Sequence, residues 1–329
     1  MPHAPRRRLL LAAAAAPVAA LSSPSAWAQP ASAAASGPIR ILVGFAPGGT
    51  IDVVGRMLAD RMRDDLGVPV VVESRPGAGG QIAAQQLRSA APDGRTLLLS
   101  PDHTMVMLPL TVKEPGFVPA EFTPIAQVAR YPGGLAVPAS SGVRTLADWL
   151  SLAKANPAQA NVGIPAPGSI PQFLVHLMSR QSGVPLTSVP YRGSAPLVQD
   201  LLGGQIGAGT TALGDFLEHH AAGRLRVIGV LDQRRSPALP EVPTFAEQGQ
   251  RLAWEYWLGL FAPRGTPAAT VERLNQSVAR ALVAPDVRER MQRIVFEPAH
   301  GSPAALAETV RTGTAYWEPV VRSSGWVPQ

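Results

Sequence analysis

The sequence predicts an α/β protein of two lobes, each a doubly wound sheet with helices on its faces, joined by two crossings of the chain. Three observations predict this fold class. From residue 39 onward, short apolar runs alternate with glycine-rich turns and amphipathic helical segments, which is the pattern of a parallel sheet covered by helices. A second series of the same kind begins near residue 137. A long strand predicted at 254–262 then returns the chain toward the first lobe.

The first lobe is expected to contain parallel strands that are buried on both faces. The run at 68–73 is continuous and rich in Val, which is typical of such a strand. Thr266-Pro267 and Ser302-Pro303 each put a capping hydroxyl before a proline at the first helical position, so two helices are expected to complete this lobe. In order along the start of the lobe, we predict strands at 39–45, 68–73 and 96–100 and helices at 51–66 and 81–91.

The second lobe continues the alternation with shorter elements. We assign 38–136 and 257–329 to lobe I and 137–256 to lobe II, with the crossings near Ala136 and Tyr256. A lobe interrupted by another makes a hinge, so a ligand is expected to bind in the cleft between them. Within lobe II we predict helices at 145–155, 170–182, 195–203 and 213–221 and strands at 161–164, 187–190, 205–210 and 225–231.

Residues 1–28 have the composition of a bacterial secretory signal peptide. Arg6 to Arg8 precede an apolar run at 9–21, and Ala26-Trp27-Ala28 is a small-x-small cleavage signal. The apolar run is shorter than the roughly 20 residues that span a membrane, so a permanent anchor is the weaker interpretation. The arginines resemble a twin-arginine signal but Pro5 does not, which leaves both the Sec and the twin-arginine routes open. Residues 29–37 are expected to be a disordered linker and the mature chain to be periplasmic.

Composition excludes several classes of function. The chain has no cysteine, which excludes a lipid anchor on cysteine, disulfides and thiol catalysis. It has 29 basic and 23 acidic side chains, three of the basic ones in the predicted signal peptide, so nucleic-acid binding is not indicated. No H-E-x-x-H, G-x-S-x-G or Walker sequence is present. His219 and His220 are adjacent on a predicted helix, so their side chains diverge by about 100°. We therefore expect no enzyme activity, no metal and no cofactor.

The most informative segment is 45–52, which joins the carboxyl end of a strand to the start of a helix. The amides of Gly49, Thr50 and Ile51 are expected to point outward with the positive end of the helix dipole, which makes a seat for an anion. In open α/β sheets ligands bind at the edge formed by the carboxyl ends of the strands. The alternative is an ordinary strand-to-helix turn, with Asp52 capping the helix.

Three further segments are interpreted in the same way. Pro76-Gly77-Ala78-Gly79-Gly80 is expected to be a second donor loop, because Ile82 stands where a dinucleotide fingerprint needs its third glycine. In lobe II, Ser169 precedes a helix and can cap it or bind a ligand. Arg192 can pair with a carboxylate, or can be an ordinary surface arginine.

Six short motifs follow one another along the chain. They are Ala46-Pro47-Gly48-Gly49-Thr50-Ile51-Asp52 with Arg56; Arg75-Pro76-Gly77-Ala78-Gly79-Gly80; Pro92-Asp93-Gly94 with Thr96-Leu97; Val189-Pro190-Tyr191-Arg192-Gly193; Asp200-Leu201-Leu202-Gly203-Gly204-Gln205; and Leu239-Pro240-Glu241-Val242-Pro243-Thr244 with Glu247 and Gly249. In this order and with these gaps, from about residue 39 to the C-terminus, they resemble the Bug-type receptors of tripartite tricarboxylate transporters.

The resemblance implies a type II periplasmic-binding-protein fold, with a ligand cleft between its lobes and closure on binding. It implies a monomer that binds a small carboxylate and delivers it to a small and a large membrane subunit. A sensory receptor that docks on a sensor kinase is the alternative function. The resemblance also places ligand contacts at Phe45, Gly48, Gly49, Thr50, Asp52, Ala78, Gly79, Ser100, Asp102, His103, Gly168, Ser169, Gln172, Tyr191 and Arg192.

The sequence departs from the family pattern in lobe II. Gln172 stands where the family usually has a histidine, and Gly207 and Thr211 stand where it has acidic residues. A wall with fewer charges is expected to accept a less polar acid, for example an aromatic one.

Overall fold

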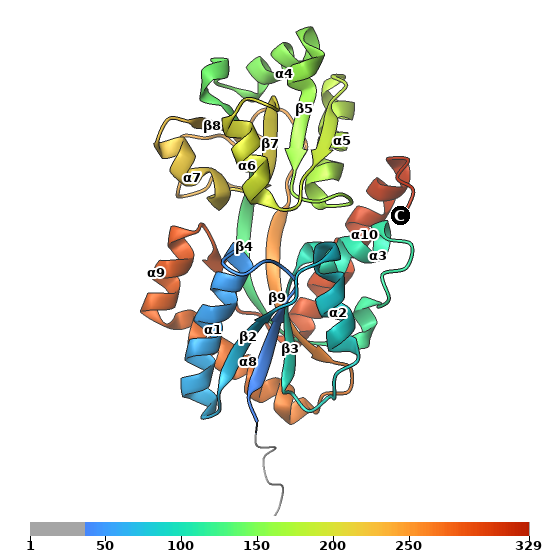
Figure 1. Cartoon of the computed structure of the whole chain (residues 1–329), viewed down its shortest axis with the longest axis vertical. Helices are drawn as coiled ribbons and strands as arrows, with labels where there is room; N and C mark the ends of the chain where they lie inside the picture. The colour runs from blue at the N-terminus through green and yellow to red at the C-terminus, as the bar shows by residue number, and fades with distance from the viewer. Residues whose placement is uncertain (1–36, 329) are drawn as a thin grey trace, which may run out of the picture. The chain divides into compact units, whose positions relative to one another are not determined.

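The computed structural model describes residues 37–328, and the predicted signal peptide and nearly all of the predicted linker lie outside the described residues. The strands form two sheets, A and B, which share one long strand, β4 (Figure 1). In sheet A the order is β2-β1-β3-β9-β4, with β10 also on β4. Its strands are β1 (Ile39–Val43), β2 (Val70–Ser74), β3 (Thr96–Pro101), β4 (Phe122–Pro138), β9 (Glu255–Pro263) and β10 (Glu297–Pro298).

Strands β1, β2 and β3 are parallel neighbours, so their carboxyl ends lie at one edge of sheet A. Strand β9 runs antiparallel between β3 and β4. Strand β4 pairs with β9 as far as Pro132 and with the strands of sheet B from Gly133 onward. The chain therefore passes from one sheet to the other within a single strand, and returns just before β9.

Sheet B has the order β6-β5-β7-β4, with β8 also on β4. Its other strands are β5 (Asn161–Ile164), β6 (Thr187–Pro190), β7 (Ala208–Ala212) and β8 (Leu225–Leu231). Because β5, β6 and β7 are parallel, their carboxyl ends also meet at one edge.

Helices cover both faces of each sheet. On one face of sheet A, β1 residues Ile41 and Val43 pack with α1 and α8, and on the other Leu42 packs with α2 and α10. Alternate strand residues point to opposite faces, which explains this division. The helices of sheet A are α1 (Thr50–Leu66), α2 (Gln81–Arg88), α3 (Leu108–Thr111), α8 (Ala268–Val283), α9 (Pro285–Arg293) and α10 (Pro303–Ser323); those of sheet B are α4 (Leu146–Ala155), α5 (Ile170–Ser182), α6 (Ser194–Leu202) and α7 (Gly214–Ala221).

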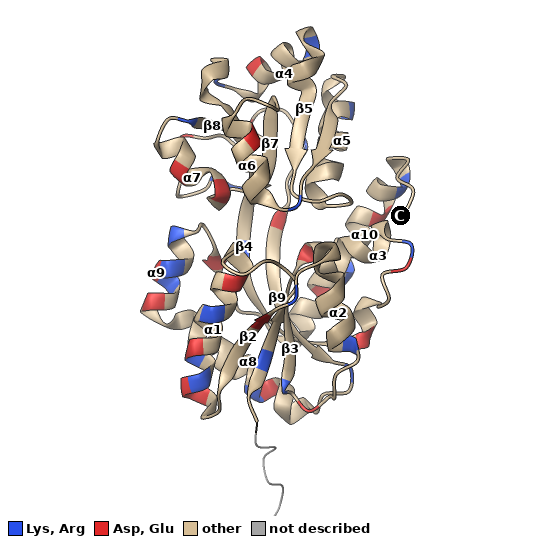
Figure 2. Ribbon diagram, viewed as in Figure 1, with Lys and Arg blue, Asp and Glu red and all other residues tan. Residues whose placement is uncertain are grey.

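Charged side chains are frequent on α1 and α9 (Figure 2), where Arg61 of α1 pairs with Asp286 of α9 and Asp65 of α1 pairs with Arg280 of α8. Among the described residues, no helix is long and apolar enough to cross a membrane.

Most predicted elements are confirmed, one predicted strand is shifted, and two elements were not predicted. The strand expected at 205–210 runs from Ala208 to Ala212, because Gly207 still belongs to the turn that follows α6. The C-terminal region holds α9 as well as the two helices predicted there. Strand β4 was not predicted, because Pro124, Pro132 and the two glycines after it interrupt its apolar pattern.

Candidate ligand-binding site

The predicted site residues lie at the carboxyl ends of the parallel strands of both sheets. In sheet A they follow β1, β2 and β3, and in sheet B they follow β5 and β6. Two of these segments have the same backbone design: the first loop (residues 46–52) leads from β1 into α1, and the second loop (residues 166–172) leads from β5 into α5. Both begin Ala-Pro-Gly.

In the first loop, Asp52 holds the turn in place. Its carboxylate is 2% exposed and accepts hydrogen bonds from the Gly48 amide at 2.9 Å, from the Ser74 hydroxyl at 3.1 Å and from both Nε and Nη2 of Arg56. Burial alone would raise the pKa of Asp52, but the bonds from Arg56, Gly48 and Ser74 together lower it. Asp52 therefore organises the turn through the amide of Gly48. The capping role expected for it is corrected, because the N-cap Gly49 receives no bond from a side chain.

The first turn of α1 presents free amides. Gly49 is the N-cap and has no side chain, and its own amide makes a long bond of 3.3 Å to the carbonyl of Ala46. Within residues 37–328, the amides of Thr50 and Ile51 have no acceptor. Two of the three donors expected from the sequence are thus available at the positive end of a helix of 17 residues.

The loop at 77–80 packs against the residues that follow β3. All four residues have positive φ angles, including Ala78 at 45°. A Cβ on Gly79 would lie 2.5 Å from Nε2 of His103, and the Thr104 hydroxyl donates to the Gly79 carbonyl at 2.8 Å. Glycine at 79 is needed both for its backbone angle and for this close approach.

Next to this loop, Asp102 is buried and His103 is partly buried. The Asp102 carboxylate accepts the indole N–H of Trp254 at 2.8 Å and the amide of His103 at 2.8 Å. Burial raises the pKa of Asp102 to about 7, more than these two donors offset, and burial lowers the pKa of His103 to about 4. The buried Nδ1 of His103 has no partner among the described residues. Ser100 is also buried, and its hydroxyl contacts the Pro101 carbonyl.

The second loop repeats the first with a neutral side chain. Oε1 of Gln172 accepts from the Gly168 amide at 2.7 Å, as Asp52 does from Gly48, again across four residues. Ser169 is the N-cap of α5, but its hydroxyl donates to the Ala166 carbonyl at 2.6 Å. Pro171 has no N–H, so the amides of Ser169 and Ile170 are the donors at this start that lack an acceptor in residues 37–328.

The segment after β6 lies beside the second loop. The amides of Tyr191 and Gly193 donate to the carbonyls of Ile164 and Pro165. The Tyr191 hydroxyl donates to Asp200 at 2.8 Å, and burial together with this bond raises the pKa of Tyr191 to about 12. Arg192 is exposed and has no acidic partner within the described residues.

Sequence reasoning missed the residues beside the crossing between the sheets. Tyr131 of β4 stacks on Tyr256 of β9, with ring centroids 5.4 Å apart. Asp215, at the start of α7, accepts from the Thr211 hydroxyl at 2.9 Å, and burial raises the pKa of Asp215. Burial raises the pKa of Tyr131 most strongly, and the negative charges of Asp102 and Asp215 raise it further. No sequence motif marks these residues, because the crossing brings them together from distant segments.

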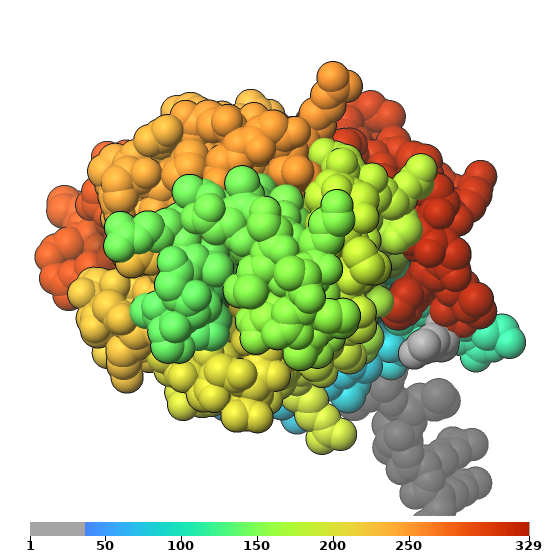
Figure 3. Space-filling view, turned by 90° about the horizontal axis from the view of Figure 1, so that it is seen from above, coloured from blue at the N-terminus to red at the C-terminus, as the bar shows by residue number. Residues whose placement is uncertain are grey.

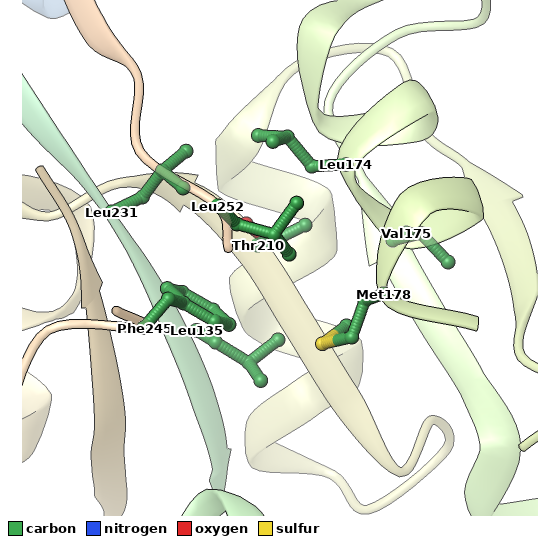
Figure 4. Close-up of a pocket in the computed structure, with 8 residues that line it drawn as sticks. All are labelled: Leu135, Leu174, Val175, Met178, Thr210, Leu231, Phe245 and Leu252. Atoms are coloured by element: carbon green, nitrogen blue, oxygen red, sulfur yellow. The ribbon is translucent and has the colours of Figure 1, made fainter. Parts of the chain in front are cut away.

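Two cavities lie away from these loops. A small apolar cavity between α5 and sheet B is lined by Leu135, Leu174, Val175, Met178, Thr210, Leu231, Phe245 and Leu252 (Figure 4). A groove of about 550 Å³ lies between the start of β4 and α10. Among the described residues, no three His, Asp or Glu side chains are grouped to hold a metal.

Comparisons with known proteins match both the sequence and the fold. Residues 54–326 match the model of the tripartite tricarboxylate transporter family receptor. Protein BugT of Bordetella pertussis is 33% identical over 291 residues, which is 88% of this chain and 89% of BugT. Rpa4515 of R. palustris, solved with adipate, has a TM-score of 0.83 and 33% identity over 89% of this chain and 98% of its own. MatC of Rhodopseudomonas palustris, solved with bound malate, has a TM-score of 0.79 and 31% identity over 86% and 98%.

Proposed function

Because the chain belongs to the tripartite tricarboxylate transporter family of receptors, we propose that it binds a small carboxylate between two lobes and delivers it to a membrane transporter. The family and the type II periplasmic-binding-protein fold predicted from the sequence are confirmed. In this proposal the lobes comprise 38–136 with 257–329 and 137–256, and the ligand binds at the loops that follow the carboxyl ends of their strands.

The single observation that carries the proposal is the pair of matching helix starts, one on each sheet. Each presents amides without acceptors among the described residues, and each is held by a side chain four residues after the glycine of its turn. One carboxylate at a helix start gains about 0.3–1 kcal/mol, and up to about 2 kcal/mol when partly buried. Micromolar affinity needs about 8.2 kcal/mol, so the ligand must engage both starts and further polar groups.

Two solved relatives support the choice of ligand class. Rpa4515 was solved with adipate and MatC with malate, and both are dicarboxylates. A ligand that contacts both lobes favours their closed arrangement by the difference between its affinities for the two states. The protein acts by binding and performs no chemistry on its ligand.

The compartment and partners follow from the same proposal. Residues 1–28 direct export to the periplasm, and the mature monomer meets a small and a large membrane subunit there. Deletion of the gene should abolish uptake of the bound acid. Normal uptake in the deletion strain would reject the transport role and favour the sensory one.

Ligand binding is tested first by thermal unfolding with adipate, malate, citrate, acetate and benzoate. A ligand that binds only the folded protein raises its melting temperature. Gly49→Leu should abolish the increase and leave the fold intact, because Gly49 has an ordinary φ of −69° and a Cβ there meets only the Ala46 carbonyl at 3.3 Å.

Gly203→Leu is the matched control, because Gly203 is exposed, has a φ of −77° and lies at the end of α6. No increase with any acid in the wild type, or an equal increase in both variants, would contradict the proposal.

A further inference from the structure

We infer that Trp326, near the C-terminus, is a positioning residue for the second loop, which it braces against α3. The inference rests on the proposed function, because it takes the second loop as part of the ligand site. It concerns a residue outside every motif and outside the site predicted from the sequence.

Trp326 joins segments that belong to different sheets. Its indole N–H donates to the carbonyl of Thr111, the last residue of α3, at 2.9 Å. Its ring meets Phe173 of α5 edge to face, with centroids 5.8 Å apart. Figure 3 shows the C-terminal residues in red directly beside the yellow-green residues of α5. One side chain thus bonds to a helix of sheet A and packs on a helix of sheet B.

The second loop is shaped for this contact at Gly168. A Cβ built on Gly168 would lie 2.8 Å from the Thr111 hydroxyl and 3.5 Å from Cζ2 of Trp326. Gly168 also has a φ of +66°, which favours glycine. Thr111 is itself fixed, because its hydroxyl donates to the Met107 carbonyl at 2.7 Å. The loop therefore lies against a surface made by Thr111 and Trp326.

The burial of the second loop is consistent with its support by Trp326. Gly168, Ser169 and Ile170 are buried, whereas Gly48 and Gly49 of the first loop are exposed. The first loop is held by Asp52, Arg56 and Ser74, all from the elements around β1 and β2. The second loop is held by two neutral groups, the Gln172 side chain and the Ser169 hydroxyl, and support from Trp326 takes the place of the Asp52–Arg56 ion pair.

Amide hydrogen exchange followed by NMR tests the brace without any ligand. Trp326→Ala should speed the exchange of the Gly168 and Gln172 amides by roughly tenfold or more, because both amides are bonded within the second loop and are exposed when it opens. The amide of Gly48, at the equivalent place of the first loop, and the amide of Val53, bonded to the carbonyl of the N-cap Gly49, are the internal control and should not change. Unchanged exchange at Gly168 and Gln172 would overturn the inference.

Two further variants separate the contacts. Trp326→Phe keeps a ring on Phe173 but loses the bond to the Thr111 carbonyl, and should give an intermediate effect. Val327→Ala changes the neighbouring residue, which is 74% exposed, and should have none. An effect of Val327→Ala as large as that of Trp326→Ala would show general loosening of the C-terminus and would overturn the role of the indole.

Adipate affinity by calorimetry gives the functional readout. Trp326→Ala should weaken it by about three- to tenfold, because a loop that is not preorganised must be ordered by the ligand. Tighter adipate binding by Trp326→Ala would show that Trp326 covers the site and competes with the ligand. That result would reject its role in positioning the second loop. If adipate and the other acids do not bind the wild type, the proposed function fails, and the exchange experiment still decides the inference.

Discussion

The first and second loops share a backbone design but differ in what holds them. Both turn from a strand into a helix through Ala-Pro-Gly, and in both a side chain four residues later accepts the glycine amide. The first is fixed by a charged network close in sequence and stays exposed. The second is fixed by neutral side chains within the loop and by contacts from α3 and the C-terminus, and its residues 168–171 are buried.

The difference has a consequence for binding. An exposed loop that holds its own shape can receive the ligand carboxylate first, with little reorganisation. The second loop depends on contacts across the two sheets, so its geometry is tied to their relative arrangement. We expect it to complete the site as the lobes close on the ligand.

The largest effect should come from removing the side chains that hold the two glycines. Asp52→Ala leaves the Gly48 amide, Arg56 and Ser74 without their common acceptor, and should lower the free energy of unfolding by about 2–4 kcal/mol. Gln172→Ala removes one neutral acceptor and should cost about 1 kcal/mol. Urea unfolding measures both. Equal losses would show that the two loops are held with equal strength.

A smaller effect should separate the glycines themselves. Gly48 and Gly168 have φ angles of +79° and +66°, so alanine strains both backbones by about 1 kcal/mol. A Cβ at 48 meets nothing within 4 Å, whereas one at 168 meets Thr111 and Trp326. Gly168→Ala should therefore be more destabilising than Gly48→Ala by about 1–2 kcal/mol. If Gly48→Ala and Gly168→Ala lower the free energy of unfolding equally in the same urea experiment, Gly168 does not pack closely against Thr111 and Trp326.

In the wild type the smallest effect is a pH dependence beside the loop at 77–80, because two opposing contributions to stability largely cancel. The pKa of Asp102 is raised to about 7, so its contribution to stability is complete below its unfolded pKa near 3.8 and is lost as the pH rises to 7. The pKa of His103 is lowered to about 4, so its contribution is present above its unfolded pKa near 6.5 and is lost as the pH falls to 4. Between pH 4 and 6.5 the two slopes oppose each other.

Single replacements should expose each slope. The melting temperature of Asp102→Asn should fall relative to that of the wild type as the pH is lowered from 6.5 to 4. The melting temperature of His103→Gln should fall relative to that of the wild type as the pH is raised from 4 to 6.5. Thermal unfolding at half-unit pH steps measures this. Parallel curves for the three proteins would mean that neither group has a perturbed pKa.

Features that depend on neighbouring residues could be predicted from the sequence. The helix predicted from Ile51 begins at Thr50, and Asp52 organises the turn before it, because both depend on residues within one turn. Strand β4 was missed because its prolines and glycines resemble a loop, while its pairing with both sheets keeps it extended.

The contacts around the candidate site join residues that are distant in the sequence. Trp254 and Asp102 are 152 positions apart, and Trp326 and Thr111 are 215 apart. No spacing rule connects such residues, since only the folded sheets bring them together. For the same reason the sequence indicated the amides of both loops but not that the second loop is buried under Trp326.

In the proposed complex, backbone amides at both helix starts hold the carboxylates of the ligand. Amide proton shifts in a titration with adipate, or with malate if adipate does not bind, test it most directly. The amide protons of Thr50, Ile51, Ser169 and Ile170 should move downfield as they donate to the carboxylate, and more than the remaining amides do. Saturable binding that leaves these four resonances in place would contradict the account.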